Sequence, residues 1–173
     1  MGYIIVIAGA PGSGKTTITK RLHQHFQSVM IEIGWLRQYH LDPAWLKASP
    51  REEAMSFENL IFIVRNYLKH DYEYILINDL EDHRIQQIPF LFELHQFMII
   101  TLVISNDEEH KRRVLDPDRD SGYRDYTAAI AQNHIFIDRP LLDNEHKFDN
   151  TYVDSEEACQ QIISLISKQK PYT

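Results

Sequence analysis

The loop sequence GAPGSGKT at residues 9–16 constrains the fold of this chain more than any other stretch. Its spacing, a glycine, four residues and then Gly-Lys-Thr, is typical of loops that hold phosphate groups. Before it, residues 3–8 form a short apolar run that predicts a buried parallel strand. After it, residues 15–26 predict a helix with Ile18 and Leu22 on one apolar stripe. Strand, loop and helix in this order are the context in which the spacing indicates a phosphate site.

The residue types in this loop suit a polyphosphate such as that of ATP. Glycines allow backbone N–H groups to turn toward negative oxygens, and the following helix adds the positive end of its dipole. Lys15 supplies a mobile cation for the β- and γ-phosphates, and the Thr16 hydroxyl suits Mg²⁺. We therefore expect the nucleotide to contact Gly9, Ala10, Pro11, Gly12, Ser13, Gly14, Lys15, Thr16 and Thr17.

Length and charge limit the kind of protein this can be. With 173 residues, of which 43% are hydrophobic and 25% charged, the chain suits one domain over residues 1–173 with a packed core. A formal net charge of -7 argues against a large nucleic-acid footprint, which would favour a basic surface. The single cysteine, Cys159, cannot form an intrachain disulfide, and no apolar run is long enough to span a membrane. We therefore expect a cytoplasmic protein that is not embedded in a membrane.

Apolar runs alternate with amphipathic stretches along the chain. The expected strands cover residues 3–8, 29–33, 73–79, 97–104 and 147–154. The expected helices cover residues 15–26, 50–69, 84–95, 123–133 and 155–168, and a further helix carries residues 110–113. Residues 35–45 suggest a short helix and a loop, and residues 135–140 fit either a helix end or a short strand. Strands alternating with helices predict a three-layer α/β fold, a parallel sheet with helices on both faces and ligands at the carboxyl ends of its strands.

Local signals mark several helix boundaries. Ser49 precedes Pro50, and Glu52 follows at the third helical position, so that these residues predict a capping box. Residues 105–108 predict the start of the helix that carries residues 110–113. Pro89 must lie in the first turn of the expected helix 84–95 or break it.

Two carboxylates end expected strands near the phosphate loop. Asp79 follows the apolar residues 75–77 and is a candidate either for the Mg²⁺ shell or for accepting the proton of an acceptor hydroxyl. Glu32 ends the second strand in a similar way and is a candidate for orienting an acceptor or a metal-bound water. The alternative is that both are solvated acids at strand ends. We expect both residues to contribute to catalysis and to acceptor binding.

Four arginines lie on or near residues 115–123, whose proline, glycine and alternating charges predict a mobile excursion. They are Arg112, Arg113, Arg119 and Arg124. A guanidinium suits two-point contact with phosphate, so we expect Arg112 and Arg113 to assist nucleotide binding and Arg113 and Arg119 to assist catalysis. The first two are neighbours on a helix, and so one of them should face the site. The alternative is that these arginines pair with nearby surface carboxylates.

Two further arginines fall where an acceptor would bind. Arg37 lies just past the second strand, and Arg84 lies five residues after Asp79. An anionic acceptor would use such cations, whereas an exposed salt bridge would occupy them without a functional role.

In these residues the chain resembles small P-loop kinases of the nucleoside monophosphate kinase, shikimate kinase and gluconate kinase kind. The resemblance rests on residues 9–16, on the arginine-bearing residues 112–124 and on residues 152–155, and it covers nearly the whole chain. It implies the strand order 2-3-1-4-5, Mg-ATP as phosphoryl donor and a short lid over ATP at about residues 115–123. It also implies an acceptor held by the segments after strands two and three, with Asn150, Thr151 and residues 154–156 near the base.

The chain departs from two of these subfamilies at the acceptor side, and likeness to gluconate kinases rests on overall form. Shikimate kinases show Asp-x-Asp at the end of strand two, where this chain has Glu32-Ile33-Gly34. Nucleoside monophosphate kinases commonly show Asp-Gly-x-x-Arg after strand three, where this chain has Asp79 and the more distant Arg84. We expect an ATP-dependent kinase of a small-molecule acceptor. The alternatives are a P-loop ATPase or nucleotide switch with a protein partner, a polynucleotide 5′-hydroxyl kinase and a catalytically inactive nucleotide-binding module.

Overall fold

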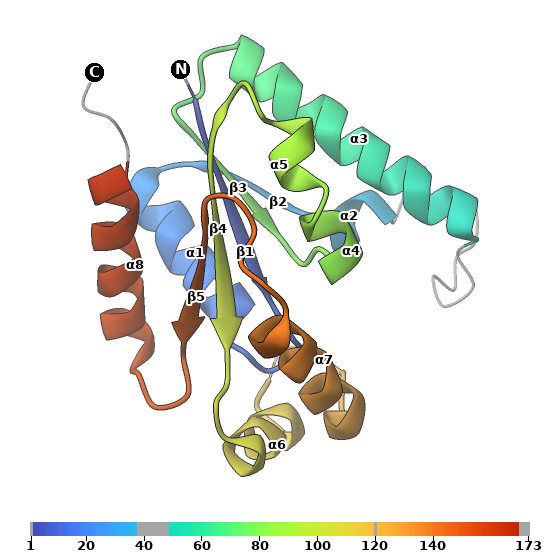
Figure 1. Cartoon of the computed structure of the whole chain (residues 1–173), viewed down its shortest axis with the longest axis vertical. Coiled ribbons are helices and arrows are strands. Elements are labelled where there is room, and N and C mark those ends of the chain that lie inside the picture. Colours follow the sequence, from blue (N-terminus) through green and yellow to red (C-terminus); the bar gives the residue numbers. More distant parts are fainter. Residues whose placement is uncertain (1, 38–48, 120, 170–173) are drawn as a thin grey trace.

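The computed structural model describes residues 2–37, 49–119 and 121–169. Within them, five strands form one parallel sheet in the order β2-β3-β1-β4-β5 (Figure 1). The strands are β1 (Tyr3–Gly9), β2 (Val29–Glu32), β3 (Tyr74–Asn78), β4 (Gln96–Val103) and β5 (Glu145–Asp149). The expected architecture and strand order are therefore confirmed.

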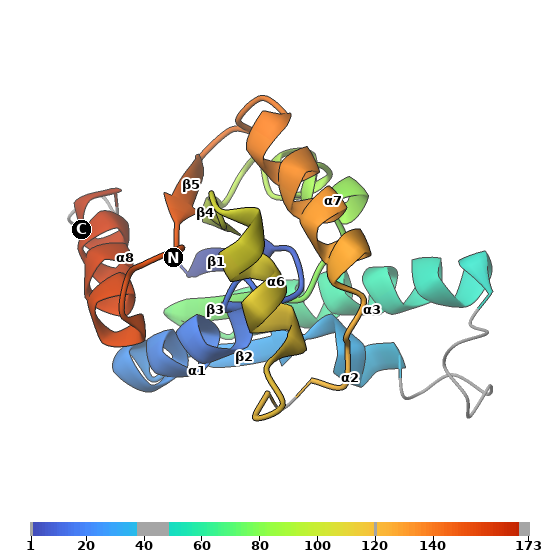
Figure 2. The same cartoon turned by 90° about the horizontal axis from the view of Figure 1, so that it is seen from below.

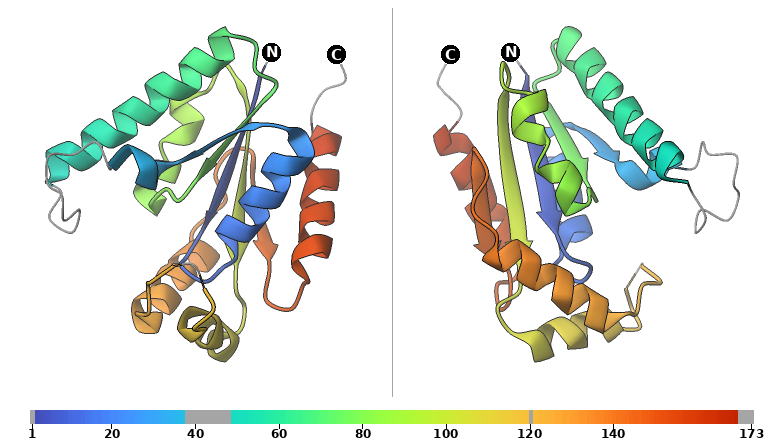
Figure 3. Two further views of the ribbon diagram at one scale, coloured as in Figure 1. Left: turned by 180° about the vertical axis from the view of Figure 1, so that it is seen from behind. Right: turned by 45° about the vertical axis from the view of Figure 1, so that its right-hand side comes forward.

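Helices cover both faces of this sheet, which gives three layers (Figures 2 and 3). They are α1 (Lys15–Phe26), α2 (Ile33–Arg37), α3 (Pro50–Lys69), α4 (Asp82–Ile85), α5 (Ile88–Leu91), α6 (Asp107–Leu115), α7 (Tyr126–Asp138) and α8 (Ser155–Gln169). Helices α1 and α8 lie on one face, and α3, α4, α5 and α7 lie on the other. In Figure 2, which looks at the carboxyl ends of the strands, α6 crosses the end of the sheet.

The alternation of side chains along β1 divides the core into two clusters. Ile5 and Ile7 face α1 and α8, where they belong to the cluster of Leu22 and Ile162. Ile4 and Val6 belong to the opposite cluster, which α3, α4, α5 and α7 complete. All seven residues of β1 are buried, as expected for the central strand of a parallel sheet. The loop that follows β1 therefore begins from a fully buried strand at the centre of the sheet.

Several helix boundaries follow the local signals in the sequence. The Ser49 hydroxyl accepts a hydrogen bond from the backbone N–H of Glu52, and the Glu52 carboxylate accepts one from the N–H of Ser49. The expected capping box is thus confirmed. Asn106 begins α6, since its side-chain oxygen accepts a hydrogen bond from the N–H of Glu109.

Other expected boundaries were wrong. The second strand ends at Glu32, because Ile33 and Leu36 bury their side chains as part of the single helical turn α2. The expected helix 84–95 is instead two short helices, α4 and α5, and Pro89 lies in the first turn of the second. Residues 38–45 of the expected short helix and loop lie outside the described residues.

In the C-terminal part, the boundaries of one helix and of the last strand differ from the expected ones. Helix α7 begins at Tyr126 rather than at residue 123, because Asp125 caps it through a hydrogen bond from the N–H of Ala128. It continues to Asp138, so residues 135–138 belong to a helix end and not to a strand. The last strand covers Glu145–Asp149 rather than residues 147–154, and as an edge strand it carries polar residues that hide its apolar alternation. In the described part of the chain, no helix is both long and apolar enough to cross a bilayer.

A buried ion pair fixes β5 to its neighbours. Glu145 is 5% exposed and pairs with Arg139, whose Nη1 lies 2.6 Å from Oε2. Thr101 also donates to Glu145, and the Nε of Arg139 reaches Asp82 at 2.7 Å. Burial alone would raise the pKa of Glu145, but the hydrogen bonds from Arg139, Thr101 and the Leu142 N–H hold this pKa below its ordinary value. The ionised pair therefore stabilises the edge of the sheet.

We expect Glu145→Gln to lower the free energy of unfolding by about 3 kcal/mol, because Arg139 then keeps only Asp82 to balance its largely buried charge. Urea denaturation at pH 7 measures this, with the exposed Glu58→Gln as control. The difference in the free energy of unfolding between wild type and Glu145→Gln should be present above pH 4.5, the ordinary pKa of Glu. It should shrink as the pH falls through the lower pKa that Glu145 has in the folded state. Equal stability of wild type and Glu145→Gln at pH 7 would contradict a stabilising role of the ion pair.

Candidate functional site

A cavity of about 600 Å³ opens at the carboxyl ends of β1, β2 and β3. One wall is the loop between β1 and α1, and the opposite wall is the segment between α6 and α7, here called the α6–α7 segment (residues 116–119 and 121–125). Ten of the expected site residues line it: Pro11, Gly12, Gly14, Lys15, Thr16, Thr17, Glu32, Asp79, Arg113 and Arg119. Gly9, Ala10 and Ser13 belong to the same loop but are buried behind this surface.

The backbone of the loop presents unused donors to the cavity. The N–H of Ser13 donates to the carbonyl of Ala10 at 3.1 Å and so closes a turn. In the described part of the chain, no backbone hydrogen bond uses the N–H groups of Gly12, Gly14, Lys15 or Thr16. Helix α1 begins at Lys15, so its positive dipole end adds to these donors. Such an arrangement binds phosphate oxygens.

Two glycines make this loop conformation possible. Gly12 and Gly14 have φ angles of 88° and 97°, in the region that disfavours residues with a Cβ. A Cβ on Gly14 would lie 2.7 Å from the side-chain nitrogen of Asn150, and one on Gly12 would lie 2.8 Å from Val114. Both glycines therefore allow the loop to turn and to pack closely against α6 and the segment after β5.

Lys15 lies between the loop and Asp79. Its Nζ donates to the Ala10 carbonyl at 3.2 Å and lies 4.0 Å from the Asp79 carboxylate. The side chain is only 11% exposed, and burial lowers the pKa of Lys15 below its ordinary value. A cation in this position has few neutralising neighbours and would gain from a nearby phosphate.

Glu32 and Asp79 bring two carboxylates to the same wall. Glu32 is the last residue of β2, and Asp79 follows β3 with a positive φ of 66°, which Asp tolerates better than most residues. Partial burial, and secondarily the charge of Asp79, raise the pKa of Glu32 above its ordinary value. The negative charge of Asp79 thus opposes ionisation of Glu32.

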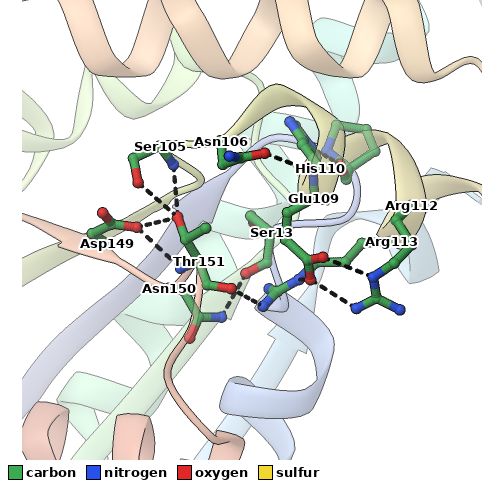
Figure 4. Close-up of polar contacts among 11 residues, drawn as sticks. Ser13, Ser105, Asn106, Glu109, His110, Arg112, Arg113, Asp149, Asn150 and Thr151 are labelled. Atoms are coloured by element: carbon green, nitrogen blue, oxygen red, sulfur yellow. Dashed lines mark hydrogen bonds and ion pairs between the residues drawn. The ribbon is translucent and has the colours of Figure 1, made fainter.

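The arginines separate into two groups. Arg113 lines the cavity, held by Glu109 (Nε–Oε1 2.9 Å) and by the backbone carbonyl of Thr151 (Nη2–O 2.6 Å; Figure 4). Arg119 also lines it and donates to the Val114 carbonyl at 3.0 Å. Arg112 does not line the cavity; it is 66% exposed and pairs with Glu109 (Figure 4). Hydrogen bonds from both Arg112 and Arg113 hold the pKa of Glu109 at about 2.

Arg37 and Arg84 lie outside the main cavity. Both line a small neighbouring hollow, together with Glu53 and Glu81. Arg37 donates to Glu53 at 2.9 Å and lies 3.6 Å from Glu81. The guanidinium of Arg84 lies over the ring of Phe57, 4.7 Å from its centre. The structure thus places the two arginines together, with Arg37 already paired.

Sequence reasoning missed part of the cavity wall. The additional lining residues are Lys20, Asp116, Asp118, Ser121 and Tyr123. Lys20 lies four residues after Thr16 on α1, and this helical spacing could have identified it. In the sequence, Asp116 and Asp118 belong to the surface carboxylates expected to pair with arginines. Their contribution to the wall depends on how the α6–α7 segment folds back, which has no local sequence signal.

The donor set near Thr16 suits a hard cation. Carboxylates of Glu32 and Asp79 and the Thr16 hydroxyl are oxygen ligands of the kind that Mg²⁺ prefers. In residues 2–37, 49–119 and 121–169, no cluster of three or more His, Cys, Asp or Glu side chains has the arrangement of a metal site. A Mg²⁺ ion here would therefore need phosphate oxygens and water to complete its shell, as is usual for this ion.

Known structures share this fold. A sugar kinase from Janibacter sp. HTCC2649 has 12% sequence identity and a TM-score of 0.67, over 96% of this chain and 95% of that chain. A gluconokinase from Sinorhizobium meliloti 1021 has 12% identity and a TM-score of 0.65, over 98% and 97%. Thymidylate kinase from Candida albicans has 17% identity and a TM-score of 0.61, over 98% and 92%. At such identities the likeness establishes the fold.

No curated protein matches the sequence. The family described as AAA domain matches residues 5–132, which include most of β1, the glycine-rich loop, the cavity-lining acids and α6. This match covers most of the chain, and the likeness to the kinase structures extends over almost its full length. The chain has the kinase-like P-loop fold and belongs to the AAA domain family.

Proposed function

We propose that this protein is an ATP-dependent phosphotransferase that moves the γ-phosphoryl group of Mg-ATP to a small-molecule acceptor. The observation that carries the proposal is the set of unused amides at Gly12, Gly14, Lys15 and Thr16, residues that line a cavity with the largely buried Lys15 side chain in its wall. Phosphoryl transfer depends mainly on positioning and on neutralising negative charge, and this wall offers both. The likeness to a sugar kinase, a gluconokinase and a thymidylate kinase supports the same class of reaction.

The cations of the cavity would share the charge of the phosphates. Lys15 is nearest the loop, Arg113 comes from α6 and Arg119 comes from the α6–α7 segment. Because they lie on different elements, they could surround a phosphate chain from several sides. Closure of the α6–α7 segment over bound ATP would exclude water from the transferred group.

The carboxylates would serve the metal and the acceptor. Thr16 and Asp79 would hold Mg²⁺, which supplies positive charge against the phosphate oxygens when bound. Glu32 would orient the acceptor, and its raised pKa suits a group that accepts a proton during the reaction. Asp79 is the other candidate for this proton, since it lies at the same wall.

The acceptor side favours a hydroxyl on an uncharged molecule over a phosphate. Arg37 is the natural anion-binding group there, but Glu53 and Glu81 already neutralise it. A phosphate or carboxylate on the acceptor would have to compete with both carboxylates, whereas an uncharged polyol would not. Arg84 remains a candidate contact on the same side, beside Phe57.

An acceptor screen tests the proposal. Release of ADP from Mg-ATP should exceed the no-acceptor rate with some uncharged polyol or sugar, and less so with nucleoside monophosphates. Lys15→Ala should reduce this rate by at least about 100-fold while the protein remains folded, because it removes a preorganised cation. Lys69→Ala, in the last turn of α3, is the control. If no member of a panel of sugars, sugar acids, nucleosides and nucleotides exceeds the background rate, a nucleotide switch with a protein partner becomes the better proposal.

Asp79→Asn separates catalysis from nucleotide binding. We expect the turnover number to fall by about 100-fold, as is usual when a group that handles a proton or metal is lost. The dissociation constant for ATP should change by less than about threefold, because the loop amides remain. Steady-state kinetics and calorimetry measure the two quantities, with the exposed Asp143→Asn as control. An unaltered turnover number would exclude Asp79 from the reaction.

Glu32→Gln should raise the melting temperature of the nucleotide-free protein at pH 7. Because the pKa of Glu32 is raised in the folded state, its ionised form there opposes folding, and the folded protein binds more protons than the unfolded chain above pH 4.5. The gain should be largest above the raised pKa and disappear below pH 4.5, where Glu32 is protonated in both states. Calorimetric scans from pH 4 to 8 test this, and a stability loss at pH 7 would contradict it.

A further inference from the structure

A buried histidine supports the phosphate loop from behind. His110 lies on α6 and is fully buried, three residues before Arg113. Its Cδ2 would lie 3.3 Å from a Cβ on Gly12, so the imidazole packs directly against the loop. Figure 4 shows it beside the loop, on the same helix as Arg113. None of the roles proposed above uses this residue.

The hydrogen bond that His110 makes determines its tautomer. The ring Nε2 lies 2.7 Å from the backbone carbonyl oxygen of Pro11. A carbonyl oxygen can only accept, so Nε2 carries the hydrogen and donates it. The other nitrogen, Nδ1, is buried and has no hydrogen-bond partner among the described residues. Burial also lowers the pKa of His110 below its ordinary value, consistent with a neutral ring that donates from Nε2 alone.

Like His110, two other side chains donate to carbonyls of residues 10–13 in the described part of the chain. The Nδ2 of Asn150, just after β5, donates to the Ser13 carbonyl at 2.8 Å. Lys15 donates to the Ala10 carbonyl at 3.2 Å. Together with His110, these donors occupy the carbonyls of Ala10, Pro11 and Ser13. Side chains thus bind these three carbonyls, while the N–H groups of Gly12, Gly14, Lys15 and Thr16 make no backbone hydrogen bond in the described part of the chain.

We propose that His110 is a positioning residue for nucleotide binding: by donating from Nε2 to the Pro11 carbonyl, it holds the loop in the conformation whose amides receive phosphate. The proposal rests on the proposed function, because it assumes that the loop binds a nucleotide. The same helix carries Arg113, whose guanidinium donates to the Thr151 carbonyl next to Asn150. Helix α6 therefore positions both the loop, through His110, and one cation of the cavity, Arg113.

Two matched variants separate the hydrogen bond from packing. The side-chain amide nitrogen of His110→Gln can take the position of Nε2 and still donate, whereas His110→Met has similar length and no donor. We expect the dissociation constant for MgADP to rise about tenfold in His110→Met, as for loss of one hydrogen bond, and by less than about threefold in His110→Gln. The turnover number at saturating ATP should stay within about threefold in both, since the cations and acids are untouched. Glu108→Gln, exposed on α6, is the control.

Calorimetric titration with MgADP and melting temperatures of each variant distinguish the outcomes. Equal affinities of the Met and Gln variants, or an unchanged affinity in His110→Met, would overturn the role of His110. If wild type itself does not bind MgADP, the proposed function fails instead. Nitrogen-15 NMR of wild type tests the hydrogen bond without any variant that must fold. A protonated Nε2 and unprotonated Nδ1 at His110 are expected, and the opposite tautomer would overturn the proposal.

Discussion

The backbone of the glycine-rich loop has to keep its carbonyls away from a bound anion and its amides toward it. Glycines permit this conformation but do not select it, because they allow many others as readily. Selection comes from donors outside the turn, namely His110 to the Pro11 carbonyl and Asn150 to the Ser13 carbonyl. The phosphate site thus depends on α6 and on the segment after β5 as much as on the loop itself.

The packing of the sheet edge is therefore connected to the site. Asn150 directly follows β5, and its position depends on how β5 is held against β4. The buried pair of Glu145 and Arg139, with Asp82 and Thr101 around it, fixes the beginning of that strand. The ion pair lies at one end of the five-residue strand β5, and Asn150 follows the other end. By fixing β5, this pair therefore helps to position the side-chain amide of Asn150 that holds the loop.

Two charged groups of the cavity wall, Lys15 and Glu32, lie in surroundings that disfavour their charged forms. Lys15 is largely buried with the nearest Asp79 carboxylate oxygen 4.0 Å away, and the charge of Asp79 adds to the cost of ionising the partly buried Glu32. Groups of this kind commonly cluster at functional sites, where a ligand supplies the missing charge. A polyphosphate with its metal would neutralise both the lysine and the acids, and this is the physical basis for the kinase proposal.

Interactions and patterns among residues close in the sequence determined many elements of this fold. The sequence alone identified the loop at residues 9–16, the central strands, the Ser49 capping box and the strand-end acids, since each depends on hydrogen bonds or periodicity over a few residues. Only the tertiary structure decided that Arg113 and not Arg112 faces the cavity, and that Glu53 and Glu81 neutralise Arg37. The contact between His110 and Pro11 joins residues 99 positions apart. Such pairs arise from the packing of whole elements on the sheet, which local propensities do not encode.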